Sequence, residues 1–160
     1  MTGAPGTGSV RGMLARDLVE DYPSVHVDAD ALEAARLMGE HRLPGLVVTG
    51  DGGRPIAVLP ASQVVRFVIP GYVQEDPSLA RVLDERAADR IVNELAGRRV
   101  GDLLPPRTKD LPVLHGDDTV LELAAVMARL RCPLVAIVDD DTVLGVVTAS
   151  RLLSLSLHAT

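Results

Sequence analysis

The chain carries the same pattern of residues twice. Residues 32–38 align with residues 121–127 at an offset of 89 positions (121 − 32 = 89). Further on, residues 57–62 align with residues 145–150 at an offset of 88 positions (145 − 57 = 88), so one residue is lost between the two blocks, in a turn. A duplicated unit of this size usually cannot bury its apolar face alone. The duplication therefore predicts two similar halves that pack on each other, with any ligand site within or between them.

Composition restricts the class of protein. The chain has 160 residues, of which 47% are hydrophobic, and this is enough for a folded domain with a core. A net charge of −6 and the lack of a basic stripe argue against nucleic acid as the main partner. No apolar run approaches the ~20 residues that cross a bilayer, so no membrane insertion is expected. The single cysteine, Cys132, excludes an intrachain disulfide and fits a reducing, cytoplasmic compartment.

Each copy has the pattern strand, helix, strand, strand, helix. A helix between the first two strands implies that they are parallel, and a short turn between the last two implies a hairpin. The predicted fold class is therefore α/β with mixed sheets, built from two βαββα repeats. The strands expected are 24–27, 46–48 and 56–59 in the first copy and 134–138 and 143–147 in the second, with closing helices from about Ala61 and Ala149.

The first helix of each copy is marked by a cap and an apolar stripe. Asp30 caps one helix and Thr119 the other, each with a glutamate three positions later as the reciprocal partner, Glu33 and Glu122. The stripes that follow have the spacing of a buried helix face. Their members are Ala31, Ala34, Ala35 and Met38 in the first copy and Val120, Leu123, Ala124 and Met127 in the second.

A tail and a connecting segment complete the chain. The tail is small and Gly-rich, which predicts that it is flexible. In the connection, Asp76-Pro77 predicts the start of a single helix that ends near Gly97, with an apolar side made of Leu79, Val82, Leu83, Ile91 and Leu95. The organisation expected is a flexible tail at 1–12, repeat 1 at 13–69, a helical linker at 70–99 and repeat 2 at 100–160.

Three features of the repeats carry a resemblance to a known family. A short turn containing Asp-Leu opens each copy, at residues 15–18 and 100–103. An Arg-x-Pro begins at Arg42 and again at Arg131, and residues 145–148 run into the last helix. In these features the chain resembles, from residue 13 to residue 157, a tandem pair of cystathionine-β-synthase (CBS) domains, often called a Bateman module.

The resemblance implies an architecture and a function. The two repeats would face each other across a pseudo-twofold axis, and because such modules frequently dimerise further, a homodimer is expected. Their clefts commonly bind adenosine-containing ligands such as AMP, ATP or S-adenosylmethionine, and no other cofactor is required. Such modules usually regulate an attached or associated enzyme, channel or transporter, which here would be a separate protein partner, and the chain itself is not expected to be an enzyme.

The end of the second repeat supplies the first candidate site residues. Thr148 stands where the last strand meets its helix, so its hydroxyl could cap that helix or donate to a phosphate, beside Ser150. Family members that bind adenosine typically carry an aspartate three positions later, which accepts hydrogen bonds from the ribose. Here Arg151 takes that place, and arginine has no acceptor, although it could grip a phosphate.

The first repeat departs from the family pattern at the same place. Pro60 has no hydroxyl, and Gln63, which follows Ser62, retains one acceptor oxygen. Neither copy has the complete pair of residues. The residues therefore leave three possibilities open for the clefts: weak adenosine binding, an altered anionic ligand, or no ligand.

The remaining candidates have a functional and a structural interpretation. Arg42 and Arg131 either contact a phosphate or are surface cations that complement a helix end. Leu43 and Cys132 either line a pocket for an adenine face or pack in the core, and the prolines after them end the helix. The full candidate set is Val25, Arg42, Leu43, Pro44, Ser62, Gln63, Leu114, Arg131, Cys132, Pro133, Thr148, Ser150 and Arg151.

Two hypotheses follow for the function. One is a regulatory module that senses an adenine nucleotide or a related anion, and the other is a dimerising interaction module whose clefts bind nothing. No catalytic motif is present, and the four histidines do not have the spacing of metal ligands. Leu155 and Leu157, near the end of the chain, either form a dimer surface or pack within the module.

Overall fold

Two small mixed sheets organise the chain. The computed structural model describes residues 13–82, 86–105, 113–140 and 142–158, so the expected tail, Leu83 and Asp141 lie outside the described residues. In each sheet the first strand is parallel to the second and the second is antiparallel to the third. The strands are β1 (Ser24–His26), β2 (Gly45–Thr49) and β3 (Pro55–Pro60), then β4 (Val113–His115), β5 (Leu134–Asp139) and β6 (Thr142–Thr148). The α/β class with mixed sheets is confirmed.

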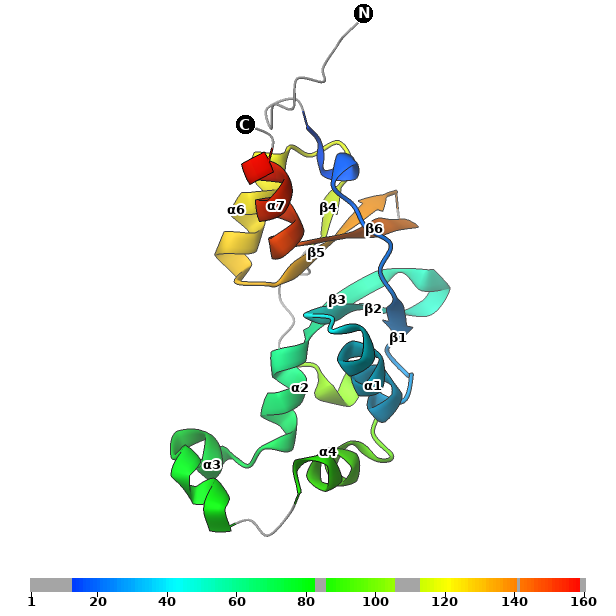
Figure 1. The fold of residues 1–160 in the computed structure, drawn as a ribbon. Helices are drawn as coiled ribbons and strands as arrows, with labels where there is room; N and C mark the ends of the chain where they lie inside the picture. The colour runs from blue at the N-terminus through cyan, green and yellow to red at the C-terminus, as the bar shows by residue number, and fades with distance from the viewer. Residues whose placement is uncertain (1–12, 83–85, 106–112, 141, 159–160) are drawn as a thin grey trace, which may run out of the picture.

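Each sheet has two helices of its own repeat. In Figure 1 the second repeat lies above the first, with α6 and α7 beside its sheet and α1 and α2 beside the sheet below. A short 3-10 turn, η3 (Asp51–Gly53), joins β2 to β3. The helices are α1 (Ala31–His41), α2 (Ala61–Val68), α6 (Val120–Leu130) and α7 (Ala149–His158), so both closing helices begin at the predicted residue.

The caps of α1 and α6 match the prediction to different degrees. In α6 the capping box is complete, with Thr119 and Glu122 each bonded to the other's backbone N–H. In α1 the Asp30 carboxylate accepts the Glu33 N–H at 2.9 Å, but the Glu33 carboxylate lies 3.1 Å from Arg36. The reciprocal half of the first box was therefore wrong, because an arginine one turn away offers Glu33 a charged partner. The buried stripes are confirmed, with Ala35 and Ala124 half-buried at their edges.

The linker is not one helix. It contains α3 (Gly71–Glu75), a 3-10 helix η4 (Pro77–Val82) and α4 (Ala87–Leu95), with Arg86 extended before α4. Leu79 and Ile91 are twelve positions apart (91 − 79 = 12), which at about 100° per residue turns them roughly 120° away from each other. A single straight helix could not bury both ends on one side. Leu95 is fully buried, whereas Leu79 and Ile91 stay more than one-third exposed.

A small core joins the two sheets. Its buried members are Val47 of the first repeat and Leu134, Ala136 and Val146 of the second. Gly45 allows the close approach, because a Cβ there would lie 2.8 Å from the Leu59 carbonyl oxygen and 3.3 Å from Leu134 Cδ2. The repeats therefore share apolar surface, as the duplication predicts.

The opening turn of each repeat packs on the other repeat. The first opening segment (residues 14–22) contains the 3-10 turn η2 (Ala15–Asp17), and its Ala15 N–H donates to the Asp118 carbonyl at 2.8 Å. The second opening segment (residues 98–105) contains α5 (Val100–Leu103), whose Val100 and Gly101 N–H groups each donate to the first repeat at 2.8 Å. The buried side chains follow the same exchange. Ala15 and Leu18 belong to the second core, and Val100 and Leu103 belong to the first.

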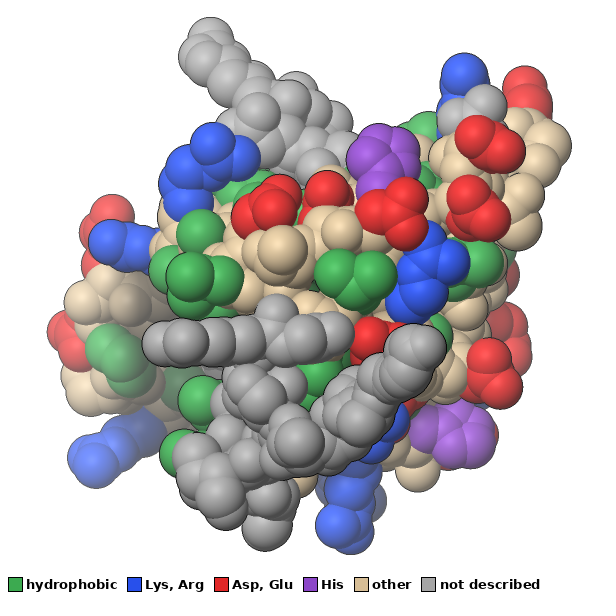
Figure 2. Space-filling model, turned by 90° about the horizontal axis from the view of Figure 1, so that it is seen from above, with side chains coloured by type: hydrophobic (Ala, Val, Ile, Leu, Met, Phe, Trp, Pro, Cys, Tyr) green, Lys and Arg blue, Asp and Glu red, His purple; other side chains and the backbone are tan. Residues whose placement is uncertain are grey.

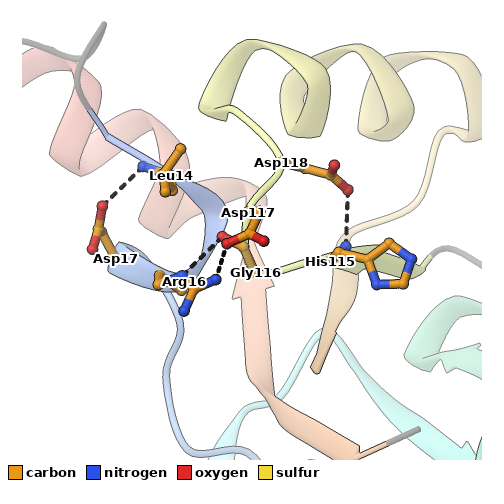
Figure 3. Close-up of polar contacts among 7 residues, drawn as sticks. All are labelled: Leu14, Arg16, Asp17, His115, Gly116, Asp117 and Asp118. Atoms are coloured by element: carbon orange, nitrogen blue, oxygen red, sulfur yellow. Dashed lines mark hydrogen bonds and ion pairs between the residues drawn. The ribbon is translucent and has the colours of Figure 1, made fainter. Parts of the chain in front are cut away.

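Charged side chains hold both opening segments at one repeated position. Arg16 forms an ion pair with Asp117, and its Nε donates to the Gly116 carbonyl at 3.3 Å (Figure 3). Asp28, the equivalent of Asp117 (117 − 28 = 89), lies 3.5 Å from Arg99 of the second opening segment. Each repeat thus has an aspartate at the same position, paired with an arginine of the opening segment of the other repeat.

Candidate functional site

The candidate residues gather at the starts of α2 and α7. The Ala61 N–H, first in α2, donates to the Pro44 carbonyl at 2.9 Å. The Ala149 N–H, first in α7, donates to the Pro133 carbonyl at 3.0 Å. These equivalent bonds bring the Arg-x-Pro segment of each repeat to its closing helix. The structure therefore forms two groups, Leu43, Pro44, Ser62 and Gln63 in the first repeat and Cys132, Pro133, Thr148, Ser150 and Arg151 in the second.

Thr148 caps α7. Its side chain is almost fully buried, and its hydroxyl oxygen accepts the Arg151 N–H at 3.1 Å. The hydroxyl also lies 3.2 Å from the hydroxyl of Ser150, which is exposed. Pro60, at the equivalent position of the first repeat, provides no side-chain cap for α2. The capping role that the sequence left open for Thr148 is the one that the geometry displays.

Gln63 and Arg151 occupy the same repeat position and make the same contact. Gln63 Nε2 donates to the Leu103 carbonyl at 3.1 Å, and Arg151 Nε donates to the Leu18 carbonyl at 3.1 Å. The two donors are 88 positions apart (151 − 63 = 88), and the two acceptors are 85 positions apart in the opening turns (103 − 18 = 85). Each closing helix therefore holds, by a side-chain donor, the opening segment that packs on its own repeat.

The second repeat adds further contacts to this arrangement. Arg151 Nε lies 4.0 Å from a Glu20 carboxylate oxygen. Glu20 in turn exchanges two backbone hydrogen bonds with Val146 of β6, at 2.9 and 3.0 Å. A Cβ on Gly145 would lie 2.6 Å from the Glu20 carbonyl oxygen, so a glycine is needed there for the segment to approach. Next to this bridge, burial and the Glu20 charge raise the pKa of the Tyr22 phenol.

The two arginines of the Arg-x-Pro segments end the first helices. Arg42 (φ 53°) and Arg131 (φ 52°) are exposed C-cap residues in the left-handed conformation, which glycine adopts at least cost. Their position gives each guanidinium the favourable end of a helix dipole. The C-cap position is the one that the structural interpretation expects, and a contact of either arginine with a phosphate stays a prediction.

The apolar candidates divide between core and surface hollows. Cys132 packs against the second core, and burial raises the pKa of its thiol. Leu43 packs against the first core and also lines a hollow between α1 and α2. Leu114 is buried in the second core, and Val25 lines a separate hollow that runs along α1. Val25 and Leu114 therefore stand apart from the two groups at the helix starts.

The acceptors of the Gln63 and Arg151 hydrogen bonds were not predicted from the sequence. Leu18 and Leu103 contribute backbone carbonyls, which no side-chain motif marks. Their repeated Asp-Leu turns were visible, but the direction in which each turn packs was not. Within the described part of the chain, no three His, Cys, Asp or Glu side chains could together hold a metal ion. None of the described helices is long and apolar enough to cross a membrane.

Comparison with known structures extends these observations. The chain is 55% identical to a CBS domain-containing protein of unknown function from Kribbella flavida, with a TM-score of 0.79 over 91% of this chain and 99% of that one. CBSX2 in complex with AMP is 18% identical, with a TM-score of 0.65 over 92% of this chain and 98% of that one. The CBS domain pair of MJ0100, in complex with methylthioadenosine and S-adenosyl-L-methionine, is 16% identical, with a TM-score of 0.64 over the same shares. At these low identities, the last two structures show only that the chain has the same fold.

The two repeats also match a family model. The model for the CBS domain matches residues 15–70 and residues 100–158, which together make up more than half of the chain. A comparison with curated proteins finds no similar sequence. The paired sheets, the exchanged opening turns and the two matches lead to one conclusion: the chain belongs to the CBS-domain family and carries its domain as a tandem pair.

Proposed function

We propose that this chain is a non-catalytic regulatory module of the CBS-pair type that acts on a separate protein partner and closes its two clefts with its own side chains. The observation that carries the proposal is the pair of equivalent donors, Gln63 and Arg151, bonded to the opposite opening segments. An adenosine ligand held by the family's aspartate would need an acceptor at that position, and both residues use a donor there instead.

The chemistry of the two positions favours closure over ligand binding. Arginine carries five N–H donors and no acceptor, so Arg151 cannot accept from a ribose diol. The Thr148 hydroxyl oxygen accepts the Arg151 N–H in the cap of α7, and its O–H remains a donor, which cannot replace the missing acceptor for a ribose. Ligand-driven regulation requires a ligand that prefers one arrangement of the repeats. In this module, side-chain contacts within the chain would set that arrangement.

Calorimetry with AMP, ATP and S-adenosylmethionine tests the proposal. The chain is expected to show no saturable heat at ligand concentrations up to about 1 mM, a weak limit for specific ligands. The Arg151→Asp variant supplies the missing acceptor and removes the donor, and it is expected to gain adenosine binding relative to the matched control Arg151→Ala. Saturable micromolar binding by the unmodified chain would contradict closed clefts.

A second function, sensing of an anionic nucleotide in the second repeat, is favoured by one observation. Thr148, Ser150 and Arg151 lie together at the start of α7, a ten-residue helix whose N-terminus favours negative charge. The complexes of CBSX2 with AMP and of MJ0100 with S-adenosyl-L-methionine give the ligand class to test. In a thermal-shift assay, a nucleotide that binds here would raise the midpoint of unfolding. The Thr148→Val substitution would abolish that rise.

A further inference from the structure

The turn between β2 and β3 has the sequence Asp51-Gly52-Gly53, the only place in the chain where a glycine directly follows an aspartate. The Asp51 side chain is fully exposed, and Gly52 and Gly53 have φ angles of 75° and 78°. A Cβ on either glycine would meet nothing within 4 Å. The turn therefore places a carboxylate in water beside two residues that have open space around them.

Exposure alone does not distinguish this aspartate, because acidic side chains are common on the surface, and Figure 2 shows several on one face. The difference lies in the partner of the carboxylate and in the residue that follows. Four other aspartates each accept a backbone N–H at 2.8–2.9 Å and are each followed by a residue with a side chain: Asp17, Asp30, Asp102 and Asp118. Asp51 Oδ1 lies instead 3.8 Å from Nε2 of His26.

An aspartate followed by glycine can react with its own main chain. The Gly52 nitrogen attacks Cγ of Asp51 and closes a ring of that nitrogen with Cγ, Cβ, Cα and the main-chain carbonyl carbon of Asp51. One carboxylate oxygen leaves as water, taking the amide proton and one further proton, and a cyclic imide remains. Glycine favours this attack because it has no Cβ beside the nitrogen and adopts many backbone conformations. Water then opens the imide. Where water breaks the bond between the nitrogen and the main-chain carbonyl carbon, the chain runs through the aspartate side chain, which is an isoaspartyl linkage.

We propose that Asp51 is a self-modification site that forms an isoaspartyl linkage, with His26 as the donor of the further proton. Histidine side chains ordinarily gain their charge roughly between pH 8 and 5. In the neutral ring of His26, Nδ1 accepts the Asp28 N–H at 3.0 Å. In the protonated ring both nitrogens carry a proton, and the carboxylates of Asp28 and Asp51 face them at 3.7 and 3.8 Å. The Nε2 proton is then the one nearest to the oxygen that leaves.

The modification would reach the contact between the repeats. It adds one carbon to the main chain of a turn whose ends are joined by the Gly50 N–H and the Arg54 carbonyl, 2.8 Å apart. It also moves the carboxylate beside His26, whose other acidic neighbour, Asp28, lies 3.5 Å from Arg99 of the second opening segment. An aged molecule would therefore hold that segment less firmly than a new one.

The second repeat provides an internal control for the chemistry. Asp140 is the equivalent of Asp51 (140 − 51 = 89), and an aspartate with a side chain follows it in the sequence where the first repeat has Gly52. The purified full chain would be incubated for several weeks at about 37 °C and about pH 6, where histidine is partly protonated. Isoaspartate is expected to accumulate at Asp51 at least about tenfold faster than at Asp140. Mass spectrometry with electron-transfer fragmentation distinguishes the two linkages at each position.

Three variants of the turn test the route. Asp51→Asn forms the same imide by losing ammonia and should accumulate isoaspartate faster than the unmodified chain. Asp51→Glu keeps the charge but would need a larger ring, so it should form none at that position. Gly52→Ala places a Cβ beside the attacking nitrogen and should slow the reaction at least about tenfold. A rate at Asp51 no higher than at Asp140 in the unmodified chain would overturn the site, most clearly if Asp51→Asn reacted normally.

Two further measurements test the role of the histidine and the reach of the modification. His26→Gln removes the acid and should slow isoaspartate formation at about pH 6 severalfold, whereas the matched change His115→Gln in the second repeat should not. An equal rate in both variants would overturn His26 as the proton donor. Hydrogen exchange at the Val100 and Gly101 amides, which donate to the first repeat, should accelerate in the aged chain but not in aged Asp51→Glu. Unchanged exchange would overturn the link to the second opening segment.

Discussion

The two repeats share element order and strand register, yet they differ where each closing strand meets the arriving opening segment. In the second repeat Glu20 pairs with Val146, and Gly145 makes room for it. In the first repeat, Ala57 stands at the position of Gly145 (145 − 57 = 88), and Pro105 stands where Glu20 would be (105 − 20 = 85). Pro105 has no N–H to donate to the strand. The Cβ of Ala57 stands where the second repeat has only the hydrogen of Gly145 facing the opening segment. The comparison shows that the closing strand pairs with the opening segment only where two conditions are met. The strand needs a residue without a side chain, and the segment needs a residue with an N–H.

A second contrast lies where the repeats touch. Gly45 begins β2 and Leu134 begins β5, at equivalent positions (134 − 45 = 89). The glycine has no side chain, and the fully buried leucine fills the space beside it. Two large side chains could not both occupy that space, so the duplicated halves had to become unequal there.

Removing the larger member of this pair should have the largest effect. Leu134→Ala deletes a fully buried side chain at the contact between the sheets and is expected to cost about 2–5 kcal/mol of unfolding free energy in urea titration. Gly45→Ala forces a Cβ against the Leu59 carbonyl and is expected to cost about 1–3 kcal/mol. Since Leu134 is a near neighbour, the double variant should lose less than the sum. Strict additivity would mean that the two positions do not share space.

The bridge between Glu20 and Val146, which has no equivalent among the described residues of the first repeat, should be the next most sensitive feature. Gly145→Ala would drive a Cβ toward the Glu20 carbonyl oxygen, and it is expected to cost about 1–3 kcal/mol. Hydrogen exchange at the Glu20 and Val146 amides should accelerate, because both belong to the bridge. Ala57→Gly, the matched change in the first repeat, should cost only about 0.5–1 kcal/mol through chain entropy. Unchanged exchange at Glu20 in Gly145→Ala would rule out the glycine as the reason for the bridge.

The equivalent donors should have smaller and mutually similar effects. Arg151→Ala and Gln63→Ala each remove one side-chain hydrogen bond to a carbonyl, which is worth about 0.5–1.5 kcal/mol. Exchange should accelerate in the first opening segment for Arg151→Ala and in the second for Gln63→Ala. If either variant also accelerated exchange in the segment held by the other donor, the two contacts would not be independent.

The left-handed arginines should give the smallest effect, and with the opposite sign. Arg42→Gly and Arg131→Gly are each expected to stabilise the protein by up to about 1 kcal/mol, because glycine adopts a positive φ without a Cβ penalty. Thermal unfolding measures this as a rise in Tm. Alanine at either position should give no such rise, since it keeps the Cβ. A fall in Tm with glycine would show that the guanidinium contributes more than the backbone strain costs.

The sequence predicts well what periodicity and capping determine. The starts of α2 and α7, the parallel and antiparallel pairs and the buried stripes of α1 and α6 all follow from local spacing. The prediction of a single linker helix was wrong, because it took the apolar residues on both sides of Arg86 as one stripe, whereas a turn of about 100° per residue puts Leu79 and Ile91 on different faces. The roles of Gln63 and Arg151 could not be predicted either. Their partners are backbone carbonyls 40 and 133 residues away in the chain, in segments whose docking depends on the whole fold.

The exchange of opening turns bears on how such a chain could have arisen. A gene encoding one repeat would produce a polypeptide whose Asp-Leu turn has no packing surface within the same molecule. The turn could pack only on a second copy of that polypeptide. Swapping between identical protomers is a low-cost route to a dimer. Fusion of two such genes would then join the two interlocked chains into a single polypeptide. If the linker of the present chain were cleaved, each repeat would still need the other repeat to pack its opening turn.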